Sequence, residues 1–132
     1  MSKYVLDASA LLALLNDEPG AQRVEQILPQ SVIGAVNVSE TAGKLASRGM
    51  SPEDVRISIG LLNLEIIPFD RELAFAAGAL IVHTKKLGLS LGDRACLALA
   101  LARNNTAVTA ESAWSRLKLG TPIEVIRGRS TS

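Results

Sequence analysis

The segment that decides the fold is Tyr4-Val5-Leu6-Asp7-Ala8-Ser9-Ala10-Leu11-Leu12-Ala13-Leu14-Leu15, where a short apolar run ends at an aspartate and a second run begins. The first three residues are strand formers, and Asp7 stops them. Ser9 to Leu15 is typical of a helix, which Asn16 and Pro19-Gly20 close. This order predicts a strand followed directly by a helix, with Asp7 at the carboxyl end of the strand.

The same alternation of strand and helix continues along the chain. We predict further strands at 31–34, 64–69, 106–109 and 123–126, and helices at 21–28, 37–48, 51–62, 71–86, 90–104 and 112–117. The strand runs are continuously apolar, which is typical of parallel strands buried on both faces. The pattern therefore predicts an α/β fold, a three-layer α/β/α sandwich with a central, mainly parallel sheet.

Length and composition limit the possible functions. A chain of 132 residues with 48% hydrophobic residues predicts one domain, which we place at residues 1–126 with a polar C-terminal tail at 127–132. One cysteine excludes a disulfide scaffold and a multi-cysteine zinc site, and one histidine excludes a histidine-based metal site. Four aromatic residues are too few for a platform that stacks single-stranded RNA.

Membrane and export segments are also not expected. The longest apolar run, Leu73 to Val82, is too short to span a bilayer. Asp7 precedes the apolar run at residues 8–15, and Asn16-Asp17-Glu18 follows it where a signal-peptide cleavage site would need small residues. We therefore predict a cytoplasmic protein with no membrane partner. Its basic residues are concentrated after position 84, which is compatible with a polyanionic partner.

Four acidic residues stand at corresponding places in this predicted architecture. Asp7 ends the first strand and Glu111 follows the fourth, whereas Glu40 and Asp93 each lie in the first turn of a predicted helix. Strand carboxyl ends and helix amino termini share one edge of an open parallel sheet, and ligands bind at that edge. We therefore expect the four carboxylates to face the same edge, although they are far apart in the sequence.

Each acid also has a purely structural explanation. Glu40 follows Asn37 by three residues and Asp93 follows Ser90 by three, so each pair resembles a capping box. Asp7 could cap the helix that begins near Ser9. Glu111 could simply be a favourable acid at the amino terminus of the next short helix.

A cluster of carboxylates has an electrostatic requirement of its own. Two carboxylates 4 Å apart repel by roughly 4 kcal/mol at an effective dielectric constant near 20, so such a cluster needs protons or a cation. Without histidine or cysteine ligands nearby, the cation should be one that prefers oxygen, Mg²⁺ or Mn²⁺. Such a metal usually acts on phosphates, where it neutralises charge and lowers the pKa of a bound water.

The motifs together resemble a known family. Four stretches carry the resemblance in order over nearly the whole chain: residues 4–15, Asn37-Val38-Ser39-Glu40-Thr41-Ala42, residues 91–100 around Gly92-Asp93-Arg94, and Val108-Thr109-Ala110-Glu111. They resemble the PIN-domain ribonucleases, most closely the VapC toxins of type II toxin–antitoxin pairs. The resemblance implies a PIN-like α/β/α sandwich.

The resemblance also implies roles for individual residues. Asp7 and Asp93 would hold the metal, Mg²⁺ or Mn²⁺, and Glu40 would complete the catalytic site or orient the water. Glu111 would be the fourth catalytic acid, although aspartate is usual there, which leaves the number of metal ions open. Ser9, Asn37 and Thr109 would hydrogen-bond to the acids.

The implied reaction is metal-dependent hydrolysis of an RNA phosphodiester that leaves 5′-phosphate and 3′-hydroxyl products. The leading substrate is tRNA, with mRNA and rRNA as alternatives. By the same resemblance, the partners would be a VapB-type antitoxin that blocks the acidic edge and a second copy of the chain. Candidate RNA contacts, chosen by charge, are Arg94, Lys85, Lys86, Arg116 and Lys118. Arg94 is explained equally well as a partner for a neighbouring acid.

Two other functions compete with this one. An aspartyl-phosphate phosphatase would use Asp7 as its nucleophile, but that class needs an acid two residues later, where this chain has Ser9. A catalytically inactive PIN fold that binds RNA or a protein partner is the main alternative, and Glu111 is the feature that favours it. The chain has no P-loop and no Gly-x-Gly-x-x-Gly pattern, so a nucleotide cofactor is not expected.

Overall fold

The computed structural model of the chain describes residues 1–126, so the predicted tail at 127–132 lies outside the described residues. Within residues 1–126, one sheet with strand order β3-β2-β1-β4-β5 runs through the centre, and every pair of neighbouring strands is parallel. The strands are β1 (Tyr4–Leu6), β2 (Ser31–Gly34), β3 (Glu65–Ile67), β4 (Thr106–Thr109) and β5 (Ile123–Val125).

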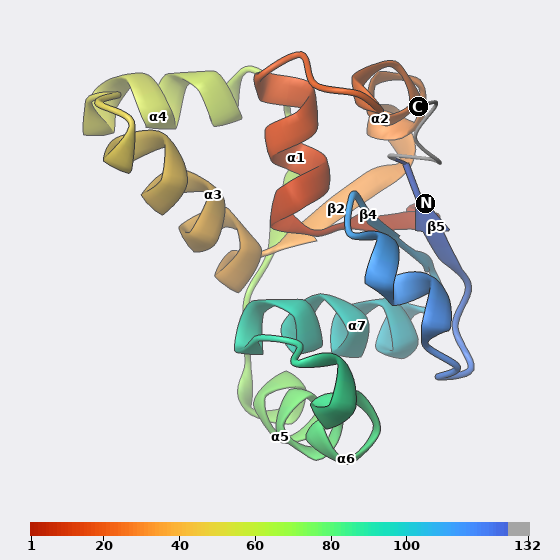
Figure 1. Cartoon of the computed structure of the whole chain (residues 1–132). Coiled ribbons are helices and arrows are strands. Elements are labelled where there is room, and N and C mark those ends of the chain that lie inside the picture. Colours follow the sequence, from red (N-terminus) through yellow and green to blue (C-terminus); the bar gives the residue numbers. More distant parts are fainter. Residues whose placement is uncertain (127–132) are drawn as a thin grey trace.

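Helices cover both faces of this sheet (Figure 1). The first layer contains α1 (Ala8–Leu15) and α2 (Ala21–Ile27), with α3 (Ala35–Ser47) and α4 (Pro52–Gly60) extending to one side. On the opposite face α7 (Leu91–Arg103) lies between the sheet and the pair α5 (Arg71–Ala79) and α6 (Ile81–Thr84). Three 3₁₀ turns complete these elements: η1 (Leu28–Gln30), η2 (Lys85–Leu87) and η3 (Ser112–Arg116).

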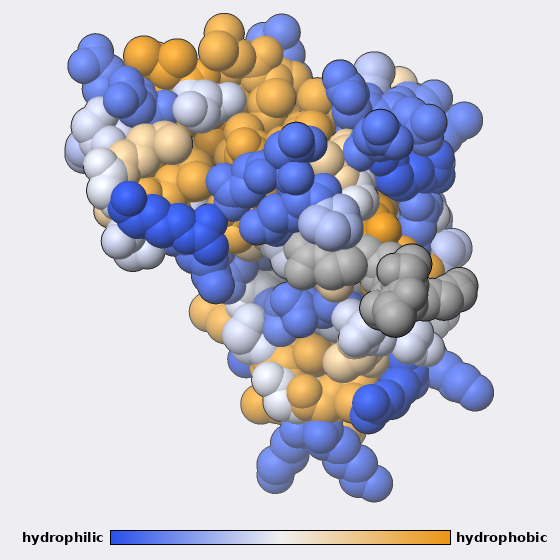
Figure 2. Space-filling view, turned by 45° about the horizontal axis from the view of Figure 1, so that its top comes forward, coloured by the Kyte–Doolittle hydropathy of each residue, from blue (hydrophilic) through white to orange (hydrophobic). Residues whose placement is uncertain are grey.

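Apolar side chains also gather on parts of the surface (Figure 2). Between α3 and α4 there is a groove of about 660 Å³, lined mainly by apolar side chains that include Val55, Ile59 and Leu64. Its rim is extended by Ile66 of the edge strand β3, which is 46% exposed. Figure 2 shows apolar surface at the upper left, on the side where Figure 1 places α3 and α4, and again at the bottom near α5 and α6.

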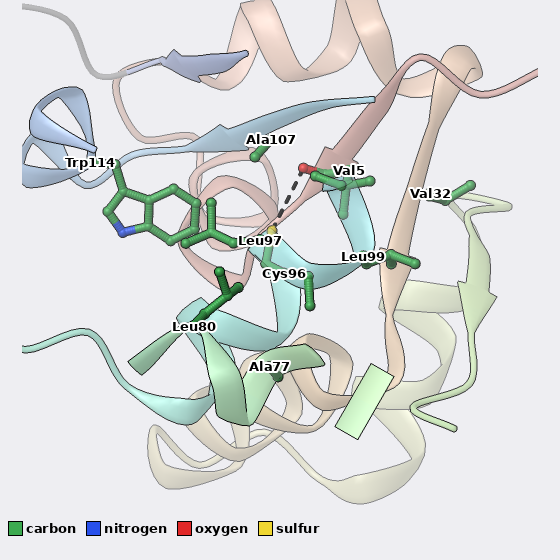
Figure 3. Packing of buried hydrophobic residues seen from close by; sticks show 11 residues of the cluster. Val5, Val32, Ala77, Leu80, Cys96, Leu97, Leu99, Ala107 and Trp114 are labelled. Atoms are coloured by element: carbon green, nitrogen blue, oxygen red, sulfur yellow. Dashed lines mark hydrogen bonds between the residues drawn. The ribbon is translucent and has the colours of Figure 1, made fainter. Parts of the chain in front are cut away.

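The core follows from alternation along the central strands, whose successive side chains face opposite helical layers. Val5 packs with α5, α7 and the buried indole of Trp114 (Figure 3), whereas its neighbour Leu6 packs with α1 and α2. The same division holds for β2 and β4. Cys96 is wholly buried in the first cluster, where its thiol contacts the carbonyl oxygen of Val5, so it is a core residue.

The predicted fold class is confirmed, with a sheet that is entirely parallel in the described residues. The ends of several elements differ from the prediction by one or two residues, and two differences concern the helices α3 and α5. The α3 helix begins at Ala35 instead of Asn37, because the backbone turns into the helix directly after β2, at Gly34. The helix predicted at 71–86 is divided at Leu80 into α5, α6 and η2. Thr84 Oγ1 donates to the Leu80 carbonyl oxygen, a local bond of the kind that bends helices.

Among residues 1–126, no helix has both the length and the apolar character that crossing a membrane requires.

Candidate active site

Asp7 lies at the junction of β1 and α1 and is only 2% exposed. Its Oδ1 accepts hydrogen bonds from Ala10 N (2.8 Å) and Ser9 Oγ (2.7 Å), and its Oδ2 accepts one from Thr109 Oγ1 (2.5 Å). The bond from Ala10 caps α1, so the structural explanation for this acid is confirmed. The bond from Thr109 also links the Asp7 carboxylate to the neighbouring strand, β4.

Burial dominates the electrostatics of this carboxyl group. It raises the pKa of Asp7 to about 6 from an ordinary value of 3.8, and repulsion from Asp93 adds to the increase. The three hydrogen bonds lower the pKa but do not compensate for burial. At neutral pH the site therefore contains a carboxylate whose negative charge is poorly solvated.

Ser9 and Thr109 fix Asp7 against the chain that follows β4. Each hydroxyl donates to Asp7 and accepts from a backbone amide: Ser9 Oγ from Ala110 N (2.8 Å) and Thr109 Oγ1 from Glu111 N (3.0 Å). Two of the three predicted hydrogen-bonding residues, Ser9 and Thr109, therefore lie beside Asp7. The bond from Glu111 N to Thr109 Oγ1 also fixes the position of the Glu111 backbone.

Glu40 approaches from α3 and is partly buried. Its Oε1 accepts a hydrogen bond from Asn37 Nδ2 (3.1 Å), which also donates to the carbonyl oxygen of Gly92 (3.1 Å). Burial and repulsion from Asp93 raise the pKa of Glu40, whereas Asn37 and Lys44 lower it. Because α3 begins two residues earlier than predicted, Gly34 occupies the cap position, and the capping-box explanation for Glu40 and Asn37 is wrong.

Asp93 does form the predicted capping box at the start of α7. Ser90 Oγ accepts from Asp93 N (3.2 Å), and Asp93 Oδ2 accepts from Ser90 N (3.0 Å). This bond orients the Asp93 side chain at the amino terminus of the helix. Asp93 therefore caps the helix and also lines a pocket together with the other acids.

All four predicted acids line one polar pocket of about 200 Å³ at the carboxyl edge of the sheet. Glu111 is exposed, precedes η3 and makes no side-chain capping bond to it. Lys44 also lines the pocket, one helical turn after Glu40, and the sequence reasoning missed it. The spacing of four residues between a glutamate and a lysine on one helix could have indicated this contact.

The residues fit a divalent cation by donor type and charge. They offer carboxylate oxygens, which Mg²⁺ and Mn²⁺ prefer, and a bound cation would relieve the poor solvation of Asp7 and its repulsion with Asp93. Within residues 1–126, however, no three acidic, histidine or cysteine side chains form a ready-made metal cage. The fit therefore rests on chemistry, without a closed coordination shell.

The predicted RNA contacts lie outside this pocket lining. Arg94 Nη1 donates to the carbonyl oxygen of Ala77 in α5 (2.9 Å). Lys85 and Lys86 are exposed in η2, and Arg116 is exposed in η3. Lys118 is exposed as well. Their contact with RNA stays a prediction.

Comparison with known proteins identifies the fold. The family model of the PIN domain matches residues 4–119, which is most of the chain. The chain belongs to the PIN domain family. None of the curated proteins matches it. Membership of this family supports a hydrolytic nuclease, in agreement with the acidic pocket.

Solved structures with the same fold come from several bacteria. The chain is similar to DNA-bound VapBC from Salmonella typhimurium, with a TM-score of 0.71, 21% identity, and coverage of 94% of this chain and 98% of that one. VapBC-1 from nontypeable Haemophilus influenzae has the same TM-score and identity, with 95% and 98% coverage. VapBC2 from Rickettsia felis, bound to a promoter DNA fragment, has a TM-score of 0.67 and 22% identity, with 92% and 96% coverage. At these identities the likeness shows the PIN fold.

Proposed function

We propose that this PIN domain is a metal-dependent endoribonuclease, the toxin of a type II toxin–antitoxin pair, with tRNA as its substrate. One observation supports this most strongly: a polar pocket on a nuclease fold contains Asp7, a nearly buried carboxyl group, together with Glu40, Asp93 and Glu111. Carboxylates concentrated in this way are typical of sites that hold divalent cations for phosphate chemistry.

In this proposal Asp7 and Asp93 hold Mg²⁺ or Mn²⁺. When bound, the metal would neutralise phosphate charge and lower the pKa of water. Ser9 and Thr109 keep the Asp7 carboxylate in one orientation, and the capping bond to Ser90 does the same for Asp93. The raised pKa of Glu40 suits it to orient the attacking water and accept its proton. Lys44 offers a positive charge to the phosphate.

The experiment is cleavage of total cellular RNA by the purified protein in Mg²⁺, Mn²⁺ or EDTA. We expect discrete, metal-dependent products, with tRNA cut first, and loss of cleavage in Asp7→Asn and Asp93→Asn. Asp70→Asn is a matched control, because Asp70 is an exposed aspartate that caps α5 through Leu73 N (2.9 Å), just as Asp7 caps α1. Full activity in both site variants would refute the assignment of Asp7 and Asp93 to the metal site, and no cleavage in either metal would favour the inactive binding module.

The proposed protein partner is a VapB-type antitoxin, and the solved relatives named above are VapBC structures. The apolar groove between α3 and α4 offers it a docking surface adjacent to the helix that carries Glu40. We expect Ile66→Asp to weaken the complex with the protein encoded beside this gene while sparing RNA cleavage, which co-purification would measure. We also expect the free protein to be a homodimer in the cytoplasm.

A further inference from the structure

Gly92, the second residue of α7, is buried beside the carboxyl group of Glu40. The space that a Cβ atom on Gly92 would occupy is filled by Glu40 Oε1, Oε2 and Cδ. The backbone of α7 and the acid of α3 therefore approach one another more closely than any other residue at position 92 would allow. This contact joins two helices that are far apart in the sequence.

Asn37 completes the enclosure of the same carboxyl group. The side chain is 1% exposed, and its Nδ2 donates both to Glu40 Oε1 (3.1 Å) and to the carbonyl oxygen of Gly92 (3.1 Å). One amide group thus holds the acid and the glycine backbone in fixed relation. The carboxylate is confined between the Asn37 amide on its own helix and the bare Cα of Gly92 on the other.

The other helical glycines within residues 1–126 lack such a contact. A Cβ atom on Gly78 in α5 would meet nothing within 4 Å. Gly78 therefore offers the same glycine-to-alanine substitution in a helix without a steric consequence. The absence of a side chain matters at position 92 because the Glu40 carboxyl group lies there. At position 78 a side chain would meet no neighbouring atom within 4 Å.

We propose that Gly92 is a positioning residue that, together with Asn37, seats the Glu40 carboxylate in the acidic pocket. The catalytic importance of this positioning rests on the proposed nuclease function, but the positioning of Glu40 by Gly92 and Asn37 does not. In Gly92→Ala the methyl group would displace the carboxyl end of Glu40. Because that end is the tip of a flexible side chain, the fold survives while the bond between Asn37 and Glu40 is lost.

The first test is a thermal double-mutant cycle, which needs no activity. Replacing glycine by alanine inside a helix usually stabilises a protein, so Gly78→Ala should raise the Tm. Gly92→Ala should raise the Tm in a Glu40→Ala background but leave it unchanged or lower it in the wild-type background. An equal change in Tm in both backgrounds would overturn the proposal that Gly92 positions Glu40.

The second test follows the position of the acid and its consequence for cleavage. In NMR spectra, the Asn37 side-chain amide resonances of Gly92→Ala should shift toward those of Glu40→Ala, whereas Gly78→Ala should leave them in place. With RNA, Gly92→Ala should lower kcat about 10- to 100-fold with little change in KM, as expected when a reacting group is misplaced. Adding it to Glu40→Ala should cause no further loss of activity.

The outcomes separate the two proposals. If the wild-type protein cleaves no RNA, the proposed function fails, while the thermal cycle and the amide resonances still decide whether Gly92 seats Glu40. If the wild type cleaves RNA and Gly92→Ala is fully active, the positioning role is overturned even where the thermal cycle shows coupling.

Discussion

The Asp7 carboxyl group accepts three hydrogen bonds, yet its pKa is about 6 instead of 3.8. A pKa that is higher in the folded than in the unfolded state means that the folded protein binds more protons between these two values. The stability associated with this group is therefore complete below about pH 4 and is lost as the pH rises through about 6. At neutral pH its charge destabilises the fold by about 3 kcal/mol.

From this follows the prediction that Asp7→Asn is inactive but more stable than the wild-type protein at pH 7. The amide is uncharged, and its oxygen can still cap α1 through Ala10 N. Urea denaturation near pH 4 and near pH 7 should show a difference between the two proteins that grows with pH. A gain for Asp7→Asn that is independent of pH would contradict the electrostatic explanation.

Glu111 is the acid that departs from the pattern of the family, and it stands on the exposed rim of the pocket. We predict that Glu111→Asp keeps or increases cleavage, because the backbone of residue 111 is already held by Thr109 Oγ1 (3.0 Å) and the shorter acid is the usual one there. Initial rates with Mg²⁺ and with Mn²⁺ measure this. A large loss of rate would show instead that the pocket has adapted to the longer side chain.

Among the elements, α7 contributes Asp93 at its first turn, where capping and orientation of the acid depend on the same residue pair. We predict that Ser90→Ala lowers the free energy of unfolding by about 1 kcal/mol, because the capping bond to Asp93 N is removed. We also expect slower cleavage, because the loosened first turn no longer fixes Ser90 N, whose N–H donates to Asp93 Oδ2. Ser51→Ala removes the corresponding bond to Asp54 N (3.1 Å) at α4, away from the pocket. It should cost similar stability without slowing cleavage, and equal cleavage rates in the two variants would contradict the orienting role.

Elements bounded by clear local signals could be predicted from the sequence. The bounds of β1, β2 and β4 agree with the prediction, because each is a short apolar run with marked ends. The division of the helix predicted at 71–86 could not be foreseen, since no glycine or proline marks Leu80, where the helix is divided and the Thr84 hydroxyl donates to the carbonyl oxygen. The α3 start was missed because Asn37 looks like a cap, whereas its amide serves a contact with another helix.

The candidate site was likewise predictable only in part. Placing four acids at one edge required only the rule for parallel sheets, and the structure brings them to one pocket. The groups that hold the acids could not be paired from the sequence, because Thr109 and Gly92 are brought to Asp7 and Glu40 by packing between distant segments. Lys44 was missed for a different reason, because its spacing of four residues from Glu40 on the same helix is a local signal that was not used.

For the whole molecule, the strand order makes the pocket a product of the complete fold. The two central strands β1 and β4 present Asp7 and Thr109 side by side, and α3 and α7 bring Glu40 and Asp93 to them from the flanks. No short segment of the chain contains more than a fraction of the site. Anything that binds the assembled carboxylates should therefore bind the folded state in preference to the unfolded chain.

This preference predicts that Mn²⁺ or Mg²⁺ raises the Tm of the wild-type protein at neutral pH. A ligand that binds only the folded state stabilises it by about 2.7 kcal/mol at 100 times its Kd. The rise should be smaller near pH 5, because Asp7 must first lose a proton there. It should disappear with EDTA and in Asp7→Asn but persist in Asp70→Asn, as thermal unfolding monitored by circular dichroism can measure. An equal rise in Asp7→Asn would mean that the cation binds elsewhere, and the proposed role of Asp7 in holding it would have to be abandoned.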